Sequence, residues 1–121
     1  MRKRIFVVDD EMAFKTLYSR LFPIYGLELI GYAADGEEAV RKLSEGLDPD
    51  LVLIDHRLPN KNGIDTMKEL HAKNPGLPIV FISADESIRS EALKDGALDF
   101  LLKPFGKDML MSAIDRHARK R

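Results

Sequence analysis

This sequence has no cysteine, no long apolar run and almost no net charge. Without cysteine, its 121 residues can form no disulfide framework, no thiolate metal site and no cysteine nucleophile. No stretch approaches the ~20 apolar residues of a membrane span, and the N-terminus has no signal-peptide core. We therefore expect a cytoplasmic protein with no membrane partner. The formal net charge of −1 gives no general reason to expect direct binding of nucleic acid.

The composition is that of an ordinary globular domain, with 45% hydrophobic and 32% charged residues. A chain of this length builds one hydrophobic core but has no room for a second. No internal repeat, low-complexity segment or linker divides it. We expect residues 1–121 to form a single domain.

Five short apolar runs alternate with segments of helical spacing. The runs are of strand length and occupy residues 4–8, 27–33, 50–55, 78–83 and 99–103. Asp35-Gly36 and Ser87 are suited to start helices. The predicted helices have these apolar faces: Phe14, Leu17 and Leu21; Ala39, Val40 and Leu43; Ile64, Met67 and Leu70; Ile88, Ala92 and Leu93; Leu110, Ala113, Ile114 and His117. The pattern predicts an α/β fold of the (βα)5 type.

Alternating strands and helices predict a doubly wound parallel sheet, covered on both faces by helices. The first, third and fourth runs are continuously apolar, as strands buried on both faces must be. The second run carries Glu28 and Gly31, which favour an edge position. With the second strand at one edge and the fifth at the other, the strand order is 2-1-3-4-5, as in flavodoxin-like folds.

Polar residues end four of these strands. Asp9 and Asp10 follow the first strand, Asp55 ends the third, Ser83 the fourth and Lys103 the fifth. Taken singly, each has an ordinary role as a helix cap, a turn residue or a surface lysine. In an open parallel sheet, however, ligands bind beyond the carboxyl ends of the strands. The convergence of all five on this edge favours a common site.

Three neighbouring carboxylates need a compensating cation if all are to stay ionised at neutral pH. Oxygen ligands without cysteine or paired histidine select a hard ion, and Mg²⁺ fits best. Mg²⁺, a lysine and a hydroxyl are also the groups that neutralise a transferring phosphoryl group. The remaining nucleophile is a carboxylate, and Asp55, in the centre of the predicted sheet, is the candidate.

The segments "VVDDE", "LVLIDHRLPNKNG", "FISA" and "DFLLKPF" resemble the motifs of the response-regulator receiver domain, in that family's order and spacing. The family is the phosphoacceptor module of two-component signalling, and the chemotaxis regulators are among its members. The resemblance implies the same fold and strand order. It also implies that Asp55 accepts a phosphoryl group from a sensor histidine kinase or a phosphotransfer protein.

The same resemblance implies the remaining site roles. Asp10 and Asp55 would bind Mg²⁺ directly, Asp9 through a water molecule, and the backbone carbonyl of Arg57 would be a further ligand. Ser83 and Lys103 would hold the phosphoryl oxygens, and Lys103-Pro104 matches the family's cis-proline pair. We also expect Arg57 and Asp85 to pair across the mouth of the site.

Phe100 falls on the family's switch aromatic, and we expect it to rotate inward as Ser83 follows the phosphoryl group. The surface that changes is built by the fourth helix, the fifth strand and the fifth helix. Its partner is a downstream protein or a fused output domain. A subfamily that dimerises through this surface uses an arginine that falls here on Ala113, so we favour a different partner over a symmetric dimer. The exposed residues expected there are Arg89, Glu91, Asp99, Lys107 and Met111.

The principal alternative is an enzyme, a Mg²⁺-dependent phosphohydrolase with an aspartyl nucleophile. Such enzymes use a second acid two residues after the nucleophile, where this chain has Arg57. A flavodoxin-like cofactor binder is less favoured, because the acids after the first strand repel phosphate unless a metal intervenes. We therefore expect a signalling switch that catalyses only its own phosphoryl transfer and dephosphorylation.

Overall fold

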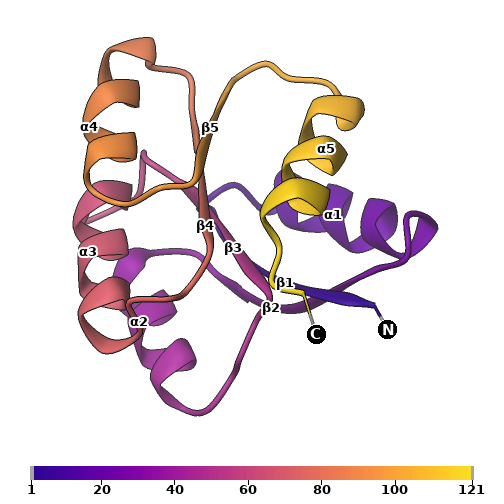
Figure 1. The fold of residues 1–121 in the computed structure, drawn as a ribbon, viewed down its shortest axis with the longest axis horizontal. Coiled ribbons are helices and arrows are strands. Elements are labelled where there is room, and N and C mark those ends of the chain that lie inside the picture. The colour runs from indigo at the N-terminus through magenta and orange to yellow at the C-terminus, as the bar shows by residue number, and fades with distance from the viewer. Residues whose placement is uncertain (1, 121) are drawn as a thin grey trace.

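The computed structural model describes residues 2–120, so the two ends of the predicted domain, residues 1 and 121, lie outside the described part. Strands and helices alternate along the chain (Figure 1). A single 3-10 turn, η1, precedes α4. The elements are β1 (Lys3–Val8), α1 (Met12–Ile24), β2 (Leu27–Ala33), α2 (Gly36–Ser44), β3 (Leu51–Asp55), α3 (Gly63–Lys73), β4 (Ile79–Ser83), η1 (Glu86–Ile88), α4 (Arg89–Lys94), β5 (Asp99–Leu102) and α5 (Lys107–His117).

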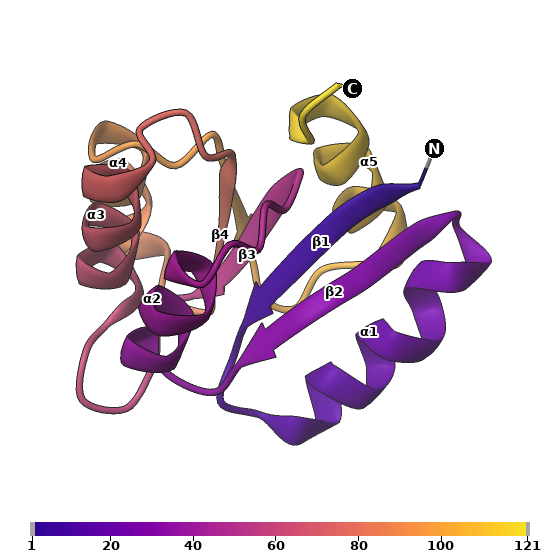
Figure 2. The same cartoon turned by 90° about the horizontal axis from the view of Figure 1, so that it is seen from below.

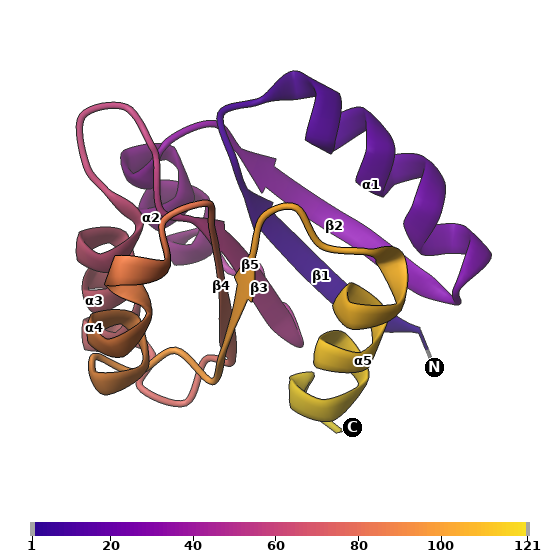
Figure 3. The same ribbon diagram turned by 90° about the horizontal axis from the view of Figure 1, so that it is seen from above.

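The five strands form one parallel sheet in the order β2-β1-β3-β4-β5, which confirms the predicted topology. Helices α1 and α5 cover one face, and α2, α3 and α4 cover the other (Figures 2 and 3). Each right-handed crossover returns the chain to the same end of the sheet, so all five strands place their carboxyl ends along one edge. This edge is where the strand-end residues of the sequence gather.

Successive side chains of a strand point to opposite faces, and the two hydrophobic cores follow this alternation. Ile5 and Val7 of β1 pack under α1 and α5. Phe6 and Val8 pack under α2, α3 and α4. Because both faces are covered, β3 and β4 are buried along their whole length. This burial on both faces confirms the predicted reason for the continuous apolar runs of β3 and β4.

The pairing of β1 with β2 contains one irregularity. Ile5 pairs with Leu29 but Phe6 pairs with Gly31, so Ile30 is an extra residue on the edge strand. A Cβ at position 31 would lie 2.7 Å from the Phe6 ring, so only glycine lets the strand approach this ring so closely. Gly31, which favoured the edge position of this strand, is thus also required for its close packing against Phe6.

Two helix predictions were wrong in detail. In α1 the buried residues are Tyr18 and Phe22, whereas Leu17 is 50% exposed. Tyr18 and Phe22 lie about one turn apart on the face turned to the sheet, and Leu17 lies beside that face.

The fourth helix also differs from its prediction. Asp85, not Ser87, caps the helical segment, which begins as the 3-10 turn η1 and leaves α4 only six residues long. Ala92 is buried as expected, but Leu93 is 41% exposed. Asp35 does cap α2, accepting a hydrogen bond from the Glu38 N–H at 2.8 Å. Within residues 2–120, no helix has the length and apolarity to cross a bilayer.

Candidate functional site

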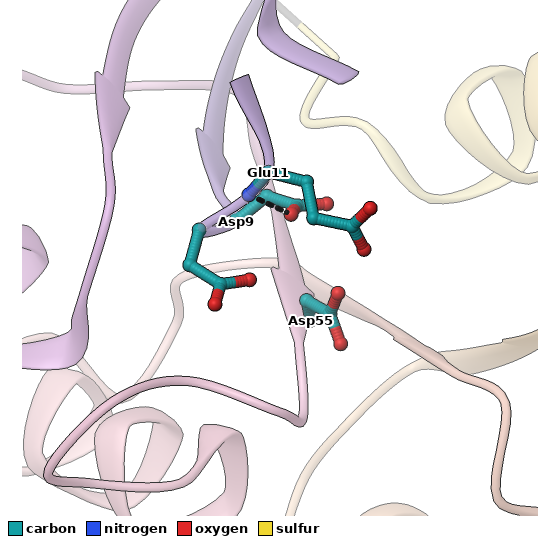
Figure 4. A group of neighbouring side chains, drawn as sticks. Asp9, Glu11 and Asp55 are labelled. Carbon is teal, nitrogen blue, oxygen red and sulfur yellow. Dashed lines mark hydrogen bonds between the residues drawn. The ribbon is translucent and has the colours of Figure 1, made fainter. Parts of the chain in front are cut away.

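The carboxyl edge of the sheet brings four acids together. Asp9, Asp10 and Glu11 follow β1, and Asp55 ends β3. Each offers one carboxylate oxygen, and these four oxygens all lie within 4.8 Å of one another. Figure 4 shows Asp9 and Glu11 beside Asp55, with the hydrogen bond that joins Glu11 to Asp9. Three of the acids were predicted to meet here, and Glu11 joins them.

A cavity of about 320 Å³ opens over this cluster. Its walls combine carboxylates with a hydroxyl and two cationic side chains, so the predicted phosphoryl-binding groups face one space. The lining residues are Asp10, Glu11, Asp55, Arg57, Ser83, Ala84 and Lys103.

Asp55 is the most central acid of the cluster, and it is only 4% exposed. Its Oδ2 accepts a hydrogen bond from Lys103 Nζ at 2.7 Å, and its Oδ1 accepts one from the Arg57 N–H at 3.1 Å. A Cβ at Gly63 would lie 2.7 Å from the Asp55 carbonyl oxygen, so the start of α3 is pressed against the end of β3. These contacts fix Asp55 from several sides.

Asp9 is buried more deeply, with 1% of its surface exposed. Its Oδ1 accepts a hydrogen bond from the Glu11 N–H at 2.9 Å, but its Oδ2 has no partner within residues 2–120. Burial raises the pKa of Asp9 from 3.8 to about 6; the Glu11 hydrogen bond opposes this rise, and the charge of Asp55 adds to it. Asp9 is therefore the acid most in need of a compensating charge.

Lys103 crosses from β5 to the acids. Its Nζ lies 2.7 Å from Asp55 and 3.7 Å from Glu11, and 4.6 Å from the centre of the Phe14 ring. Burial works to lower the pKa of Lys103, but the hydrogen bond to Asp55 and the surrounding negative charges outweigh it and leave this pKa raised. The ammonium group therefore stays charged. The Lys103-Pro104 peptide bond is cis, as expected.

Ser83 and Arg57 complete the rim. Ser83 is 3% exposed, and its Oγ accepts a hydrogen bond from the Asp85 N–H at 2.9 Å. Arg57 is exposed, and within the described residues no ion pair joins it to Asp85. Asp85 instead accepts hydrogen bonds from the N–H and hydroxyl of Ser87, which lower the pKa of its carboxyl. The expected Arg57–Asp85 pair is thus replaced by a local cap.

Sequence reasoning missed two tyrosines in the core on the side of the sheet that Asp9 faces. Tyr32 lies on the neighbouring strand β2, and its hydroxyl donates a hydrogen bond to the Asp9 backbone carbonyl. Burial raises the pKa of Tyr32 to about 12, and the negative charge of Asp9 adds to the effect. Tyr18 of α1 is buried on the same side of the sheet as Asp9. No local sequence signal links residues so far apart along the chain.

The predicted switch residue Phe100 is already turned inward, with 4% of its surface exposed. Its ring stacks on Phe81 at 6.4 Å, and the Arg89 guanidinium covers it at 4.7 Å from the ring centre. Glu86 holds this guanidinium through hydrogen bonds of 2.8 and 3.1 Å. The expectation of an outward ring that rotates inward therefore does not describe this structure.

Asp99, on the same surface, is paired within the chain. Its Oδ2 lies 3.0 Å from Arg116 Nη1 and 3.1 Å from His117 Nε2. Two α5 side chains, Arg116 and His117, thus already use the Asp99 carboxylate.

The donor set fits a hard divalent cation. All the clustered ligand atoms are carboxylate oxygens, and Asp9 Oδ2 is buried without a partner among the described residues. Two of the acids, Asp10 and Glu11, are exposed and leave room for water on the open side of the ion. This arrangement is typical of a Mg²⁺ site that keeps several waters.

Comparison with known proteins agrees with this geometry. The family profile described as "Response regulator receiver domain" matches residues 5–115. The chain is 36% identical over 118 residues to chemotaxis protein CheY of Thermotoga maritima, covering 96% of this chain and 98% of that protein. It is 37% identical over 114 residues to transcriptional regulatory protein ZraR of Escherichia coli, covering 93% of this chain but 25% of ZraR.

Solved structures of response regulators also resemble the chain. One is a CheX–CheY–BeF3–Mg²⁺ complex from Borrelia burgdorferi, with a TM-score of 0.88 and 26% identity over 94% of this chain and 87% of that one. Another is the response regulator protein TrrA of Thermotoga maritima in complex with Mg²⁺ and BeF, with a TM-score of 0.85 and 31% identity over 94% of this chain and 97% of that one.

Proposed function

Since the chain belongs to the response regulator receiver family, a family of signalling switches, we propose that Asp55 is its phosphoacceptor. A sensor histidine kinase or a phosphotransfer protein donates the phosphoryl group, and Mg²⁺ is required. We further propose that residues 1–121 form one receiver domain, which acts in the cytoplasm without direct contact to nucleic acid or membrane.

The observation that carries this proposal is the position of Asp55. Its carboxylate ends the central strand β3 and faces Lys103 at 2.7 Å within a cluster of acids. A carboxylate nucleophile has to approach phosphorus without being repelled by the oxygens of the incoming phosphoryl group. Lys103 supplies positive charge at that point, and Ser83 lines the same cavity with a hydroxyl.

In the proposed transfer, an Asp55 oxygen attacks the phosphorus of phosphohistidine while the P–N bond breaks and its electron pair leaves with the imidazole. The product is an acyl phosphate. Asp10, Asp55 and the Arg57 carbonyl would hold Mg²⁺ directly, and Asp9 through water. The bound ion supplies positive charge to the phosphoryl oxygens. Lys103 would bind one phosphoryl oxygen, for which it must exchange its present contact with Asp55.

We place the output on the surface of α4, β5 and α5. Phosphorylation adds roughly −1.5 to −2 charges and three strong acceptors at Asp55. Ser83 would follow one phosphoryl oxygen and give up its hydrogen bond from the Asp85 N–H, which starts the segment leading to η1. Arg89, the first residue of α4 directly after η1, covers Phe100. Movement of this cover is the proposed signal to a downstream protein or fused output domain.

The test is intact-protein mass spectrometry after incubation with a phosphohistidine protein or acetyl phosphate. Wild type should gain a single phosphoryl group, EDTA should prevent the gain, and Asp55→Asn should gain none. Phosphorylation of Asp55→Asn to the wild-type extent would refute the assignment. Steady turnover of a phosphomonoester would instead favour the phosphohydrolase alternative.

A further inference from the structure

Tyr18 is the largest fully buried side chain of the protein and carries a polar atom that the fold does not use. It is 1% exposed, and its hydroxyl has no hydrogen-bond partner within residues 2–120. Buried polar groups without a partner are rare, and each requires an explanation. Asp9 Oδ2 is likewise buried without a hydrogen-bond partner among these residues.

These two atoms lie on the same side of the sheet. Val7 of β1 points into the core under α1, and strand alternation directs Asp9, two residues later, to the same face. Tyr18 belongs to this core. After burial, the negative charges of Asp9 and Asp55 are the next causes that raise the pKa of Tyr18. The phenol therefore stays protonated at neutral pH and can act as a hydrogen-bond donor.

Two aromatic rings of α1 pack against the Tyr18 ring. It stacks on Phe22 with centroids 5.2 Å apart and an angle of 17° between the planes, and Phe14 packs on it at 6.0 Å. Phe14 in turn lies under the Lys103 ammonium group. These contacts link the Tyr18 ring, through Phe14, to Lys103 of the site.

We propose that the Tyr18 hydroxyl donates a hydrogen bond to Asp9 Oδ2 through one buried water molecule, and that Tyr18 is thereby a positioning residue for the cation site. Buried waters in proteins typically form hydrogen bonds with buried polar groups that have no other partner. The proposal rests on the proposed binding of Mg²⁺.

This arrangement would hold the Asp9 carboxylate at both oxygens. The Glu11 N–H binds Oδ1 at 2.9 Å, and the water from Tyr18 binds Oδ2. The Tyr32 hydroxyl fixes the Asp9 main chain by donating a hydrogen bond to the Asp9 carbonyl oxygen. A carboxylate with fixed orientation loses less freedom when it binds a hydrated cation, and groups that orient metal ligands typically contribute about 10–100-fold to affinity.

The experiment is calorimetric titration with MgCl₂ at pH 7 of wild type, Tyr18→Phe and Tyr25→Phe. Tyr25, at the end of α1, is 41% exposed and serves as the matched loss of a hydroxyl. Tyr18→Phe should raise the Mg²⁺ dissociation constant on the order of tenfold. Tyr25→Phe should leave it within twofold. Equal affinity of Tyr18→Phe and wild type overturns the proposal, whereas failure of wild type to bind Mg²⁺ overturns the proposed function instead.

The same substitution in an Asp9→Asn background separates positioning from general packing. If Tyr18 acts through Asp9, Tyr18→Phe should cause no further loss of affinity there. An equal loss in both backgrounds would overturn the connection. A high-resolution crystal structure of wild type gives a check that needs no variant. One water should lie within about 3.2 Å of both oxygens, and an ordered structure without it contradicts the proposal.

Discussion

Replacing Asp9 by asparagine should stabilise the metal-free protein at neutral pH. Asp9 is 1% exposed, and its pKa is raised from 3.8 to about 6, chiefly by burial. With 1.36 kcal/mol for each pKa unit, the difference corresponds to ~3 kcal/mol of unfolding free energy lost when Asp9 ionises in the folded state. Asparagine has the same shape and no charge, and its oxygen can still accept the Glu11 hydrogen bond.

The gain should depend on pH in a defined direction. Because the folded pKa lies above the unfolded one, the folded state holds its proton more tightly than the unfolded state. The contribution of Asp9 to stability is therefore greatest below about pH 4, falls between about pH 4 and 6, and stays low above pH 6. Asparagine does not titrate, so the advantage of Asp9→Asn should be small near pH 4 and approach ~3 kcal/mol at pH 7.

Urea unfolding followed by circular dichroism, in EDTA and at several pH values, measures this effect. The matched control is Asp10→Asn, the same change at an exposed neighbour, for which we expect less than about 1 kcal/mol. Mg²⁺ at ten times its dissociation constant should stabilise wild type by ~1.4 kcal/mol and narrow the gap. An Asp9→Asn protein that is less stable than wild type at pH 7, or a gain that is equal at pH 4.5 and 7.5, would refute the reasoning.

Two further predictions concern packing and output. Gly63→Ala should destabilise the protein by about 1–3 kcal/mol, because its Cβ would lie 2.7 Å from the Asp55 carbonyl oxygen. The control is Gly106→Ala, whose Cβ would meet no atom within 4 Å. Equal urea midpoints for the two variants would contradict this prediction. Sedimentation should find the protein monomeric with and without beryllofluoride, because Arg116 and His117 already bind Asp99. A dimer that forms with beryllofluoride and disappears in Asp99→Ala would show the opposite.

Those parts of the fold that depend on local pattern were predictable from the sequence. A strand buried on both faces has to be continuously apolar, and β3 and β4 are buried throughout. Parallel strands place their ends on one edge, so Asp55 and Lys103 had to approach each other although 48 residues separate them. Because the sheet is parallel, residues that end different strands lie together at one edge and can form a common site.

The remainder depends on packing between elements, which no local pattern encodes. An apolar face through Leu17 and one through Tyr18 differ by one helical position, and the rotation of α1 on the sheet decides between them. The contact from Tyr32 to Asp9 requires the exact register of β2. The inward position of Phe100 involves contacts with Phe81 of β4 and Arg89 of α4, which lie on other elements. The rotation of α1, the register of β2 and the position of Phe100 are each decided by tertiary contacts, which the local sequence does not specify.

In the proposed cation site, stability and cation binding depend on the same carboxylate, that of Asp9, and the two effects are reciprocal. Lys103 already compensates the charge of Asp55 at 2.7 Å, whereas Asp9 Oδ2 has no partner among residues 2–120. A cation that relieves the whole ~3 kcal/mol penalty of Asp9 gains about two orders of magnitude in affinity from it, since 1.36 kcal/mol is a factor of ten. The same gain in affinity applies when Asp9 reaches the ion through a water molecule, because the cation still compensates the negative charge of Asp9. Under the proposed function, asparagine at position 9 should therefore give a more stable fold and a weaker cation site.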